Sequence, residues 1–201
     1  MNSLLEWGLR SSIRTRWAVL SFALALASPA GAGVYHSQQE ALELAFPDAT
    51  RIDKKTHVLG DAQAEAVEAL ARAKLDSRLV SIYTGWQDDV VIGYAVIDIH
   101  TVRTQPEAFM VVVDPAGEIR SLRVLAFYEP GEYLPPERWL KQFEKKRLDE
   151  RLHLRADIHG IAGSTLTARA VTSGVRRAMA LIEILVAPPE REPGVAAPSG
   201  L

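Results

Sequence analysis

The 201-residue sequence contains no cysteine. Disulfide bonds, thiolate zinc sites, iron–sulfur clusters, c-type haem attachment and a lipid anchor on cysteine are therefore excluded. Charge is nearly balanced, at a formal net charge of −2. The sequence has no contiguous basic patch of the kind that binds nucleic acid. If the protein carries electrons, it needs an organic cofactor or a metal site without thiolates.

The five histidines are scattered, without a pair four residues apart. We therefore predict no metal site. The sequence also presents no nucleophile with a matching base and no substrate-binding constellation. It favours a protein without independent catalysis over a substrate-converting enzyme.

Residues 1–32 have the three-part pattern of a secretory signal peptide. A segment with three arginines precedes an apolar, uncharged stretch over residues 17–27, and small residues ending in Ala-x-Ala follow. We predict cleavage after Ala32 and a periplasmic or otherwise extracytoplasmic protein. The alternative is a retained membrane anchor, because residues 17–35 carry no charge and approach the ~20 residues that span a bilayer.

The remaining chain is large enough for one domain, which we place at residues 33–186, and residues 187–201 have the composition of a disordered tail. Hydrophobic periodicity predicts helices over residues 37–45, 62–73 and 136–146, strands over 79–86, 90–99, 108–114 and 119–128, a candidate strand over 152–158, and a long C-terminal helix. Strands that are grouped together, with helices before and after them, indicate an α+β fold with a mainly antiparallel sheet.

The long C-terminal helix is predicted from apolar residues at spacings of three and four, which are Leu166, Ala170, Val171, Val175, Ala178, Met179 and Ile182. At its start stand Gly163, Ser164, Thr165 and Thr167. Ser or Thr at a helix start caps backbone N–H groups, and these groups together with the helix dipole favour a phosphate. Gly163 would let a bulky anion approach the backbone. Spacing alone leaves both an ordinary capped helix and a phosphate site open.

Residues 160–171 resemble the signature of the FMN-binding domain family, which includes the FMN-carrying subunits of the Rnf and Nqr electron-transport complexes. The family pattern reads Ser-Gly-Ala-Thr-x-Thr-Ser, followed by a helix. In flavinylated members, a dedicated flavin transferase joins FMN through its phosphate to the first Thr. The resemblance places this acceptor at Thr165, matches Gly163 and Thr167 directly, and adds Ser164 and Leu166 to the phosphate end of the site.

The sequence departs from the family pattern at four positions. Ala162 and Ala168 replace Ser, Ser164 replaces Ala, and His159 stands where an acidic residue is common. The acceptor hydroxyl is kept, but the changes alter residues that a transferase would recognise. His159 either lies near the flavin phosphate or ring, or is a histidine on a loop surface.

Other segments resemble the family in the expected order, from about Gln39 to Leu185. A Phe46-Pro47 turn ends the first helix, and Gly93-Tyr94 lies on an apolar strand. The segment Glu129-Pro130-Gly131 resembles a Glu-Thr-Pro-Gly segment that lacks its Thr. Family analogy places Glu129 and its turn near the isoalloxazine ring.

The resemblance implies an exported flavoprotein that carries FMN, covalently through a phosphoester at Thr165, and acts as an electron carrier. Its implied partners are a flavin transferase and membrane or periplasmic redox proteins, not nucleic acid. Three alternatives stay open. They are a non-redox periplasmic binding or inhibitory module with the same fold, a membrane-anchored subunit of a redox complex, and a flavin reductase with loosely bound FMN.

Overall fold

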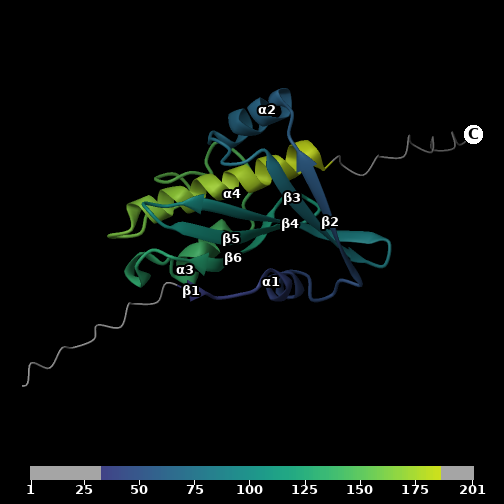
Figure 1. Cartoon of the computed structure of the whole chain (residues 1–201), viewed down its shortest axis with the longest axis horizontal. Helices are drawn as coiled ribbons and strands as arrows, with labels where there is room; N and C mark the ends of the chain where they lie inside the picture. Colours follow the sequence, from purple (N-terminus) through teal and green to yellow (C-terminus); the bar gives the residue numbers. More distant parts are fainter. Residues whose placement is uncertain (1–32, 187–201) are drawn as a thin grey trace, which may run out of the picture.

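A computed structural model describes residues 33–186, which form an α+β fold on one six-stranded antiparallel sheet (Figure 1). The predicted leader, residues 1–32, and the predicted tail, residues 187–201, lie outside the described residues. The strands are β1 (Gly33–Val34), β2 (Arg51–Val58), β3 (Leu79–Gln87), β4 (Val90–Thr101), β5 (Pro106–Val113) and β6 (Ile119–Phe127). Their order, β1-β6-β5-β4-β3-β2, makes β2 to β6 a meander, and β1 joins its far edge beside β6.

Helices lie on both faces of this sheet. They are α1 (Gln38–Ala45), α2 (Asp61–Ala71), η1 (Gly131–Tyr133), α3 (Glu137–Leu140), η2 (Lys141–Phe143) and α4 (Thr165–Leu185), the η elements being 3₁₀ turns. The long α4 runs along one face, α2 packs on the outer side of α4, and α1 lies on the opposite face (Figure 1). Within residues 33–186, no helix combines the length and the apolar character that a membrane crossing requires.

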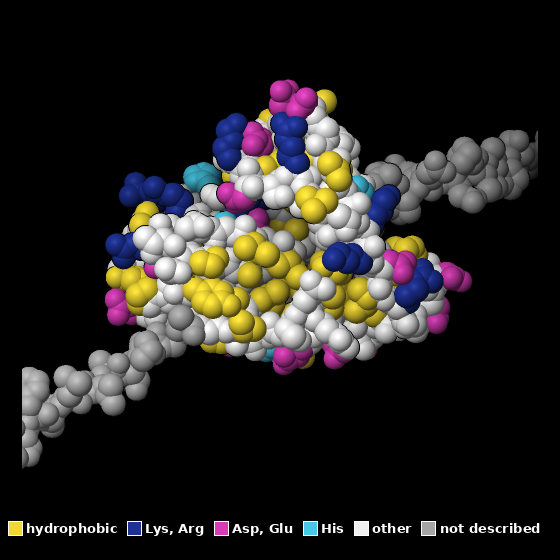
Figure 2. Space-filling model, in the orientation of Figure 1, with side chains coloured by type: hydrophobic (Ala, Val, Ile, Leu, Met, Phe, Trp, Pro, Cys, Tyr) yellow, Lys and Arg dark blue, Asp and Glu magenta, His cyan; other side chains and the backbone are white. Residues whose placement is uncertain are grey.

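Alternation along the strands produces two cores, because successive side chains point to opposite faces of a sheet. On β5, Val111 and Val113 join the larger core under α4, whereas Met110 and Val112 join the smaller core under α1. Figure 2 shows hydrophobic side chains gathered across the middle of the view, where the strands lie in Figure 1. The predicted α+β domain with a C-terminal helix is confirmed.

Gly174 sets how closely α4 approaches the sheet. A Cβ atom at this position would lie 2.5 Å from Oδ2 of Asp98 and 2.7 Å from Cζ of Phe109. Both contacts are shorter than packed atoms tolerate, so only glycine allows the observed approach. The apolar stripe of α4 is buried against the sheet from Val171 to Ile182, and Leu166, at the helix start, is 48% exposed.

The Phe46-Pro47 turn also depends on glycine. Gly85 of β3 and Gly93 of β4 are directly paired across the sheet, and the Phe46 ring lies over both. A Cβ atom on Gly85 would come within 2.6 Å of this ring. The end of α1 is therefore fixed to the sheet by an aromatic ring resting on bare backbone.

The structure differs from the sequence predictions at three elements. Strand β2 was not predicted, because it is a polar edge strand whose charged residues follow no apolar alternation. The candidate strand over 152–158 is wrong, since only Leu154 and Ile158 form an isolated bridge and Arg155 has a left-handed backbone at φ 70°. The helix over 136–146 is shorter than predicted: α3 and η2 end at Phe143, and Lys145 is left-handed at φ 62°.

Candidate functional site

The loop before α4 is anchored on the short helix α3 and the turn η2. The indole Nε1 of Trp139 donates to the carbonyl of His159 at 2.6 Å, and the His159 N–H donates to Oε1 of Gln142 at 2.9 Å. The His159 side chain is exposed, so this residue is a loop-surface histidine. These two hydrogen bonds hold the loop that leads into α4 in one conformation.

Gly163 and Ser164 shape the start of α4. Gly163 has φ 79°, a left-handed conformation that disfavours side chains with a Cβ atom. Ser164 occupies the N-cap position, but its hydroxyl donates to the carbonyl of Glu132 at 3.4 Å and does not cap the helix. The ordinary side-chain cap, one of the two alternatives that the sequence left open, is therefore not formed by Ser164.

The first turn of α4 consequently keeps open hydrogen-bond donors. The first helical bond runs from the Ala168 N–H to the Ser164 carbonyl at 3.0 Å. Within residues 33–186, the N–H groups of Thr165, Leu166 and Thr167 have no acceptor. Open N–H groups at the positive end of a 21-residue helix favour a negatively charged group.

The predicted site residues differ in exposure at this turn. Thr165 and Gly163 are exposed, and Leu166 presents an apolar side chain to solvent. Ser164 and Thr167 are buried, at 5% and 1% exposure. The accessible hydroxyl of the motif is therefore that of Thr165.

A groove of about 420 Å³ begins at Thr165 and follows α4. It is lined on the helix by Thr165, Arg169, Thr172, Ser173 and Arg176, and on the other side by Arg72, His153, Leu154 and Arg155. Its volume lies within the ~300–1,000 Å³ of typical ligand pockets. Four arginines and no carboxylate line it, so it suits an anion.

The four arginines of the groove differ in their burial and in their interaction partners. Arg176 is buried and donates to the carbonyls of Leu70, Ala71, Asp149 and Leu152 at 2.6–3.1 Å, which joins α2, α4 and the loop over residues 149–152. Desolvation lowers the pKa of Arg176. Arg72 pairs with Glu150 at 2.8 Å.

Arg155 and Arg169 are exposed, and their side chains have no ion pair or hydrogen bond within the described part of the chain. These two residues are the free cations of the groove. Neither was predicted from the sequence, although Arg169 follows Thr165 by four residues and so shares its helix face.

Glu129 occupies a different place. Its Oε1 accepts the backbone N–H groups of Arg103, Thr104 and Gln105 at 3.0, 2.8 and 3.0 Å, and the side chain is 3% exposed. These hydrogen bonds to the carboxylate lower the pKa of Glu129. Its turn reaches the motif through the contact between Glu132 and Ser164, but Glu129 does not line the Thr165 groove.

A buried ionic chain crosses the interface between α4 and the sheet. Arg177 binds both carboxylate oxygens of Asp98, Oδ2 of Asp98 lies 2.7 Å from Nδ1 of His100, and Nε2 of His100 lies 3.4 Å from Glu107. Burial opposes protonation of His100, but Asp98 and Glu107 outweigh it and raise its pKa to about 9. Burial raises the pKa of Glu107. Strand alternation places Asp98 and His100 on one face, a pairing that the sequence analysis overlooked.

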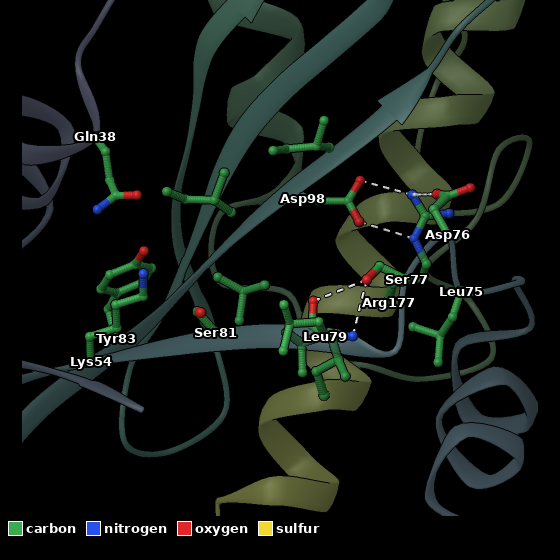
Figure 3. A pocket seen from close by; sticks show the side chains of 15 residues that line it. Gln38, Lys54, Leu75, Asp76, Ser77, Leu79, Ser81, Tyr83, Asp98 and Arg177 are labelled. Carbon is green, nitrogen blue, oxygen red and sulfur yellow. Dashed lines mark hydrogen bonds and ion pairs between the residues drawn. The ribbon is translucent and has the colours of Figure 1, made fainter. Parts of the chain in front are cut away.

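A second cavity, of about 380 Å³, opens between β3 and β4 (Figure 3). The pairing of β3 with β4 ends at Ile82 and Val96, whereas the pairing of β3 with β2 continues as far as Leu79. Strands β3 and β4 therefore diverge at this end of β3. Figure 3 shows the Asp98–Arg177 pair at one side of this opening. It shares no lining residue with the Thr165 groove. Arg177, the arginine in its lining, is buried and already paired with Asp98 and Asp76, so this cavity offers weaker chemistry for an anion.

The fold and the site together define a domain that presents an open helix start and a cationic groove to a negatively charged ligand. Residues 105–180 match the family model described as the FMN-binding domain. The match indicates an FMN-binding domain in this part of the chain, with FMN as its cofactor. A search of curated proteins found no match to the chain.

The described residues fit this cofactor. Thr165 offers an accessible hydroxyl, the first turn of α4 offers open N–H groups for a phosphate, and Arg155 and Arg169 offer positive charge. No group of His, Asp or Glu within residues 33–186 is arranged to hold a metal ion.

Proposed function

We propose that this protein is an exported electron carrier in which FMN is attached covalently to Thr165 by a phosphoester bond. The observation that carries the proposal is the position of Thr165. Its exposed hydroxyl lies at the open start of α4 and at the mouth of the cationic groove, within the matched domain.

Attachment by a flavin transferase is a phosphoryl transfer. The hydroxyl oxygen of Thr165 attacks the phosphorus of an FMN donor whose phosphate is activated as an anhydride. A new P–O bond forms, the anhydride P–O bond breaks, and the leaving phosphate departs with the electron pair. The hydroxyl proton passes to a base of the transferase, since none of the residues lining the groove at Thr165 is a carboxylate.

This chain's own residues hold the product in place. The open N–H groups of Thr165, Leu166 and Thr167 can donate to the phosphate oxygens. Gly163 keeps the approach to these groups clear, because no atom lies within 4 Å of the position that a Cβ atom would take. FMN supplies the redox chemistry when bound, and the protein supplies orientation and local charge.

Export and electron transfer complete the proposal. The leader pattern over residues 1–32 supports secretion with cleavage after Ala32, and a retained segment would make the protein a membrane-anchored subunit. A covalent tether suits an extracytoplasmic carrier, because a dissociated flavin would be lost there. The expected partners are a flavin transferase for maturation and membrane or periplasmic redox proteins.

The test is the intact mass of the exported chain made in a cell with an active flavin transferase. We expect an added mass of one FMN less water, about 438 Da, on a chain that begins at Gly33. Thr165→Val should lose this mass. Thr101→Val, which removes another exposed hydroxyl, should keep it.

Absence of added mass in the wild type, while a control protein is flavinylated by the same transferase, would refute covalent attachment. A colourless product would then favour the non-redox binding or inhibitory module. Flavin that is released by acid would favour a loosely bound cofactor. A mass that includes residues 1–32 would favour the membrane-anchored form.

A further inference from the structure

The Thr165 groove carries more positive charge than attachment requires. A phosphodiester between Thr165 and the ribityl chain retains one negative charge, which one arginine neutralises. The groove has four arginines in its lining and no Asp or Glu. Two of them, Arg155 and Arg169, have no partner of their own within residues 33–186. The surplus charge points to a second negative group in the groove.

The order of the cations along α4 indicates where that group lies. Thr165, Arg169 and Arg176 follow one another on the helix face that lines the groove. With a rise of 1.5 Å per residue, this face extends about 16 Å from Thr165 to Arg176. A group tethered at Thr165 and lying along the groove passes Arg169 within one turn, and positive charge continues beyond it.

The turn at Glu129 is a poorer place for the same group. The Glu129 carboxylate is buried and already accepts three backbone N–H groups, so it brings negative charge and offers no free donor. Ser164, which faces this turn through Glu132, is buried as well. The exposed Thr165 instead opens on the cationic groove.

We propose that the tethered flavin lies in the groove between α4 and the loop over residues 153–155, and that Arg155 and Arg169 make it easier to reduce by neutralising the charge gained on reduction. Uptake of two electrons and one proton leaves the flavin ring with one negative charge, and cations close to the ring favour this form. The electrons come from an external reductant, which is dithionite in the test below. The inference rests on the proposed function only for the tether.

A binding test separates the groove from covalent attachment. The chain is produced without a transferase and titrated with FMN and with riboflavin, which lacks the phosphate, while flavin fluorescence is followed. We expect FMN to bind roughly tenfold more tightly than riboflavin, since its phosphate can accept charge-assisted hydrogen bonds. Arg155→Gln combined with Arg169→Gln should weaken this preference, although the open N–H groups at the start of α4 remain.

The second readout is the midpoint potential of the flavinylated protein, measured by stepwise reduction with dithionite. The double variant should have a more negative potential than the wild type. Arg120→Gln combined with Arg138→Gln changes the net charge equally at exposed positions outside the groove, and should leave the potential unchanged. Thermal unfolding of both double variants verifies that they fold.

The outcomes are distinct. Equal binding of FMN and riboflavin, or a potential that both double variants leave at the wild-type value, overturns the inference. A potential that shifts with Glu129→Gln and not with the two groove arginines places the ring at the Glu129 turn and also overturns it. If the wild type gains no flavin mass, the covalent function fails alone, and the comparison of FMN with riboflavin still decides the groove.

Discussion

The guanidinium group of Arg177 on α4 binds both carboxylate oxygens of Asp98 on β4, at 3.0 and 2.8 Å. Both side chains are about nine-tenths buried, at 9% and 10% exposure. The pair lies beside Gly174, whose missing side chain leaves room for the Asp98 carboxylate. Helix α4 is thus fixed to the sheet by a buried ion pair about three turns after its start at Thr165.

Breaking this ion pair should destabilise the fold strongly. Asp98→Asn leaves the Arg177 guanidinium buried without its counter-charge, and such changes cost about 3–5 kcal/mol. The measurement is the free energy of unfolding in urea. Asp76 contacts the same guanidinium at 3.4 Å but is 59% exposed, so Asp76→Asn should cost at most about 1 kcal/mol. Equal losses in the two variants would show that burial does not decide the strength of these pairs.

Alkaline pH should weaken the fold through His100. The folded pKa is about 9, against an ordinary value of 6.5, because Asp98 and Glu107 favour the charged ring. Below pH 6.5 both the folded and the unfolded state bind the proton, so the stabilisation is complete. Between pH 6.5 and 9 only the folded state keeps it, and the free energy of unfolding falls with pH. Above pH 9 the contribution is lost.

The check is a series of urea denaturations between pH 6 and 10. His100→Gln should flatten the decline, while His153→Gln, a variant of an exposed histidine, should preserve it. Glu107→Gln should move the folded titration of His100, followed by NMR, to lower pH. A decline that persists in His100→Gln would assign it to another group.

Gly174→Ala should destabilise the protein, although alanine is the better helix former. On an exposed helix this change stabilises by about 1 kcal/mol. Here the new methyl group would lie 2.5 Å from the Asp98 carboxylate, and overpacking of this kind costs about 1–3 kcal/mol. The measurement is thermal or urea unfolding, with Ser173→Ala as the neighbouring control on the groove side of α4. A gain in stability for Gly174→Ala would contradict the close packing of α4.

The sequence predicted the parts of the fold that follow from local pattern. The stripe from Leu166 to Ile182 predicts α4, and the alternation on β3 to β6 predicts the sheet, because burial selects apolar residues at these spacings. Strand β2 was not predicted, because an edge strand needs no apolar face. It is a strand because it pairs with β3. Thr165 was predicted as the acceptor through resemblance to a family motif. Arg155 was not predicted as a site residue. It lies opposite Arg169 because of the turns between them, and turns have no hydrophobic periodicity that the sequence would reveal.

The same contrast applies to Glu129, which the sequence placed near the flavin and the structure uses to hold a loop. Glu129→Gln should accelerate amide hydrogen exchange at Arg103, Thr104 and Gln105, because a neutral amide oxygen is a weaker acceptor than the carboxylate that now receives all three N–H groups. Glu132→Gln, an exposed change in the same turn, should leave exchange at these three residues unaltered.

The pH dependence of this loop provides an independent check. Because hydrogen bonding lowers the folded pKa of Glu129, the carboxylate supports the loop above its ordinary pKa of 4.5 and loses this effect as the pH falls through the lower, folded value. After correction for intrinsic exchange, protection of the three amides should therefore fall in acid in the wild type and stay uniformly low in Glu129→Gln. Protection that is equal in both proteins at neutral pH would remove the loop-anchoring role and return Glu129 to the residues available for the flavin.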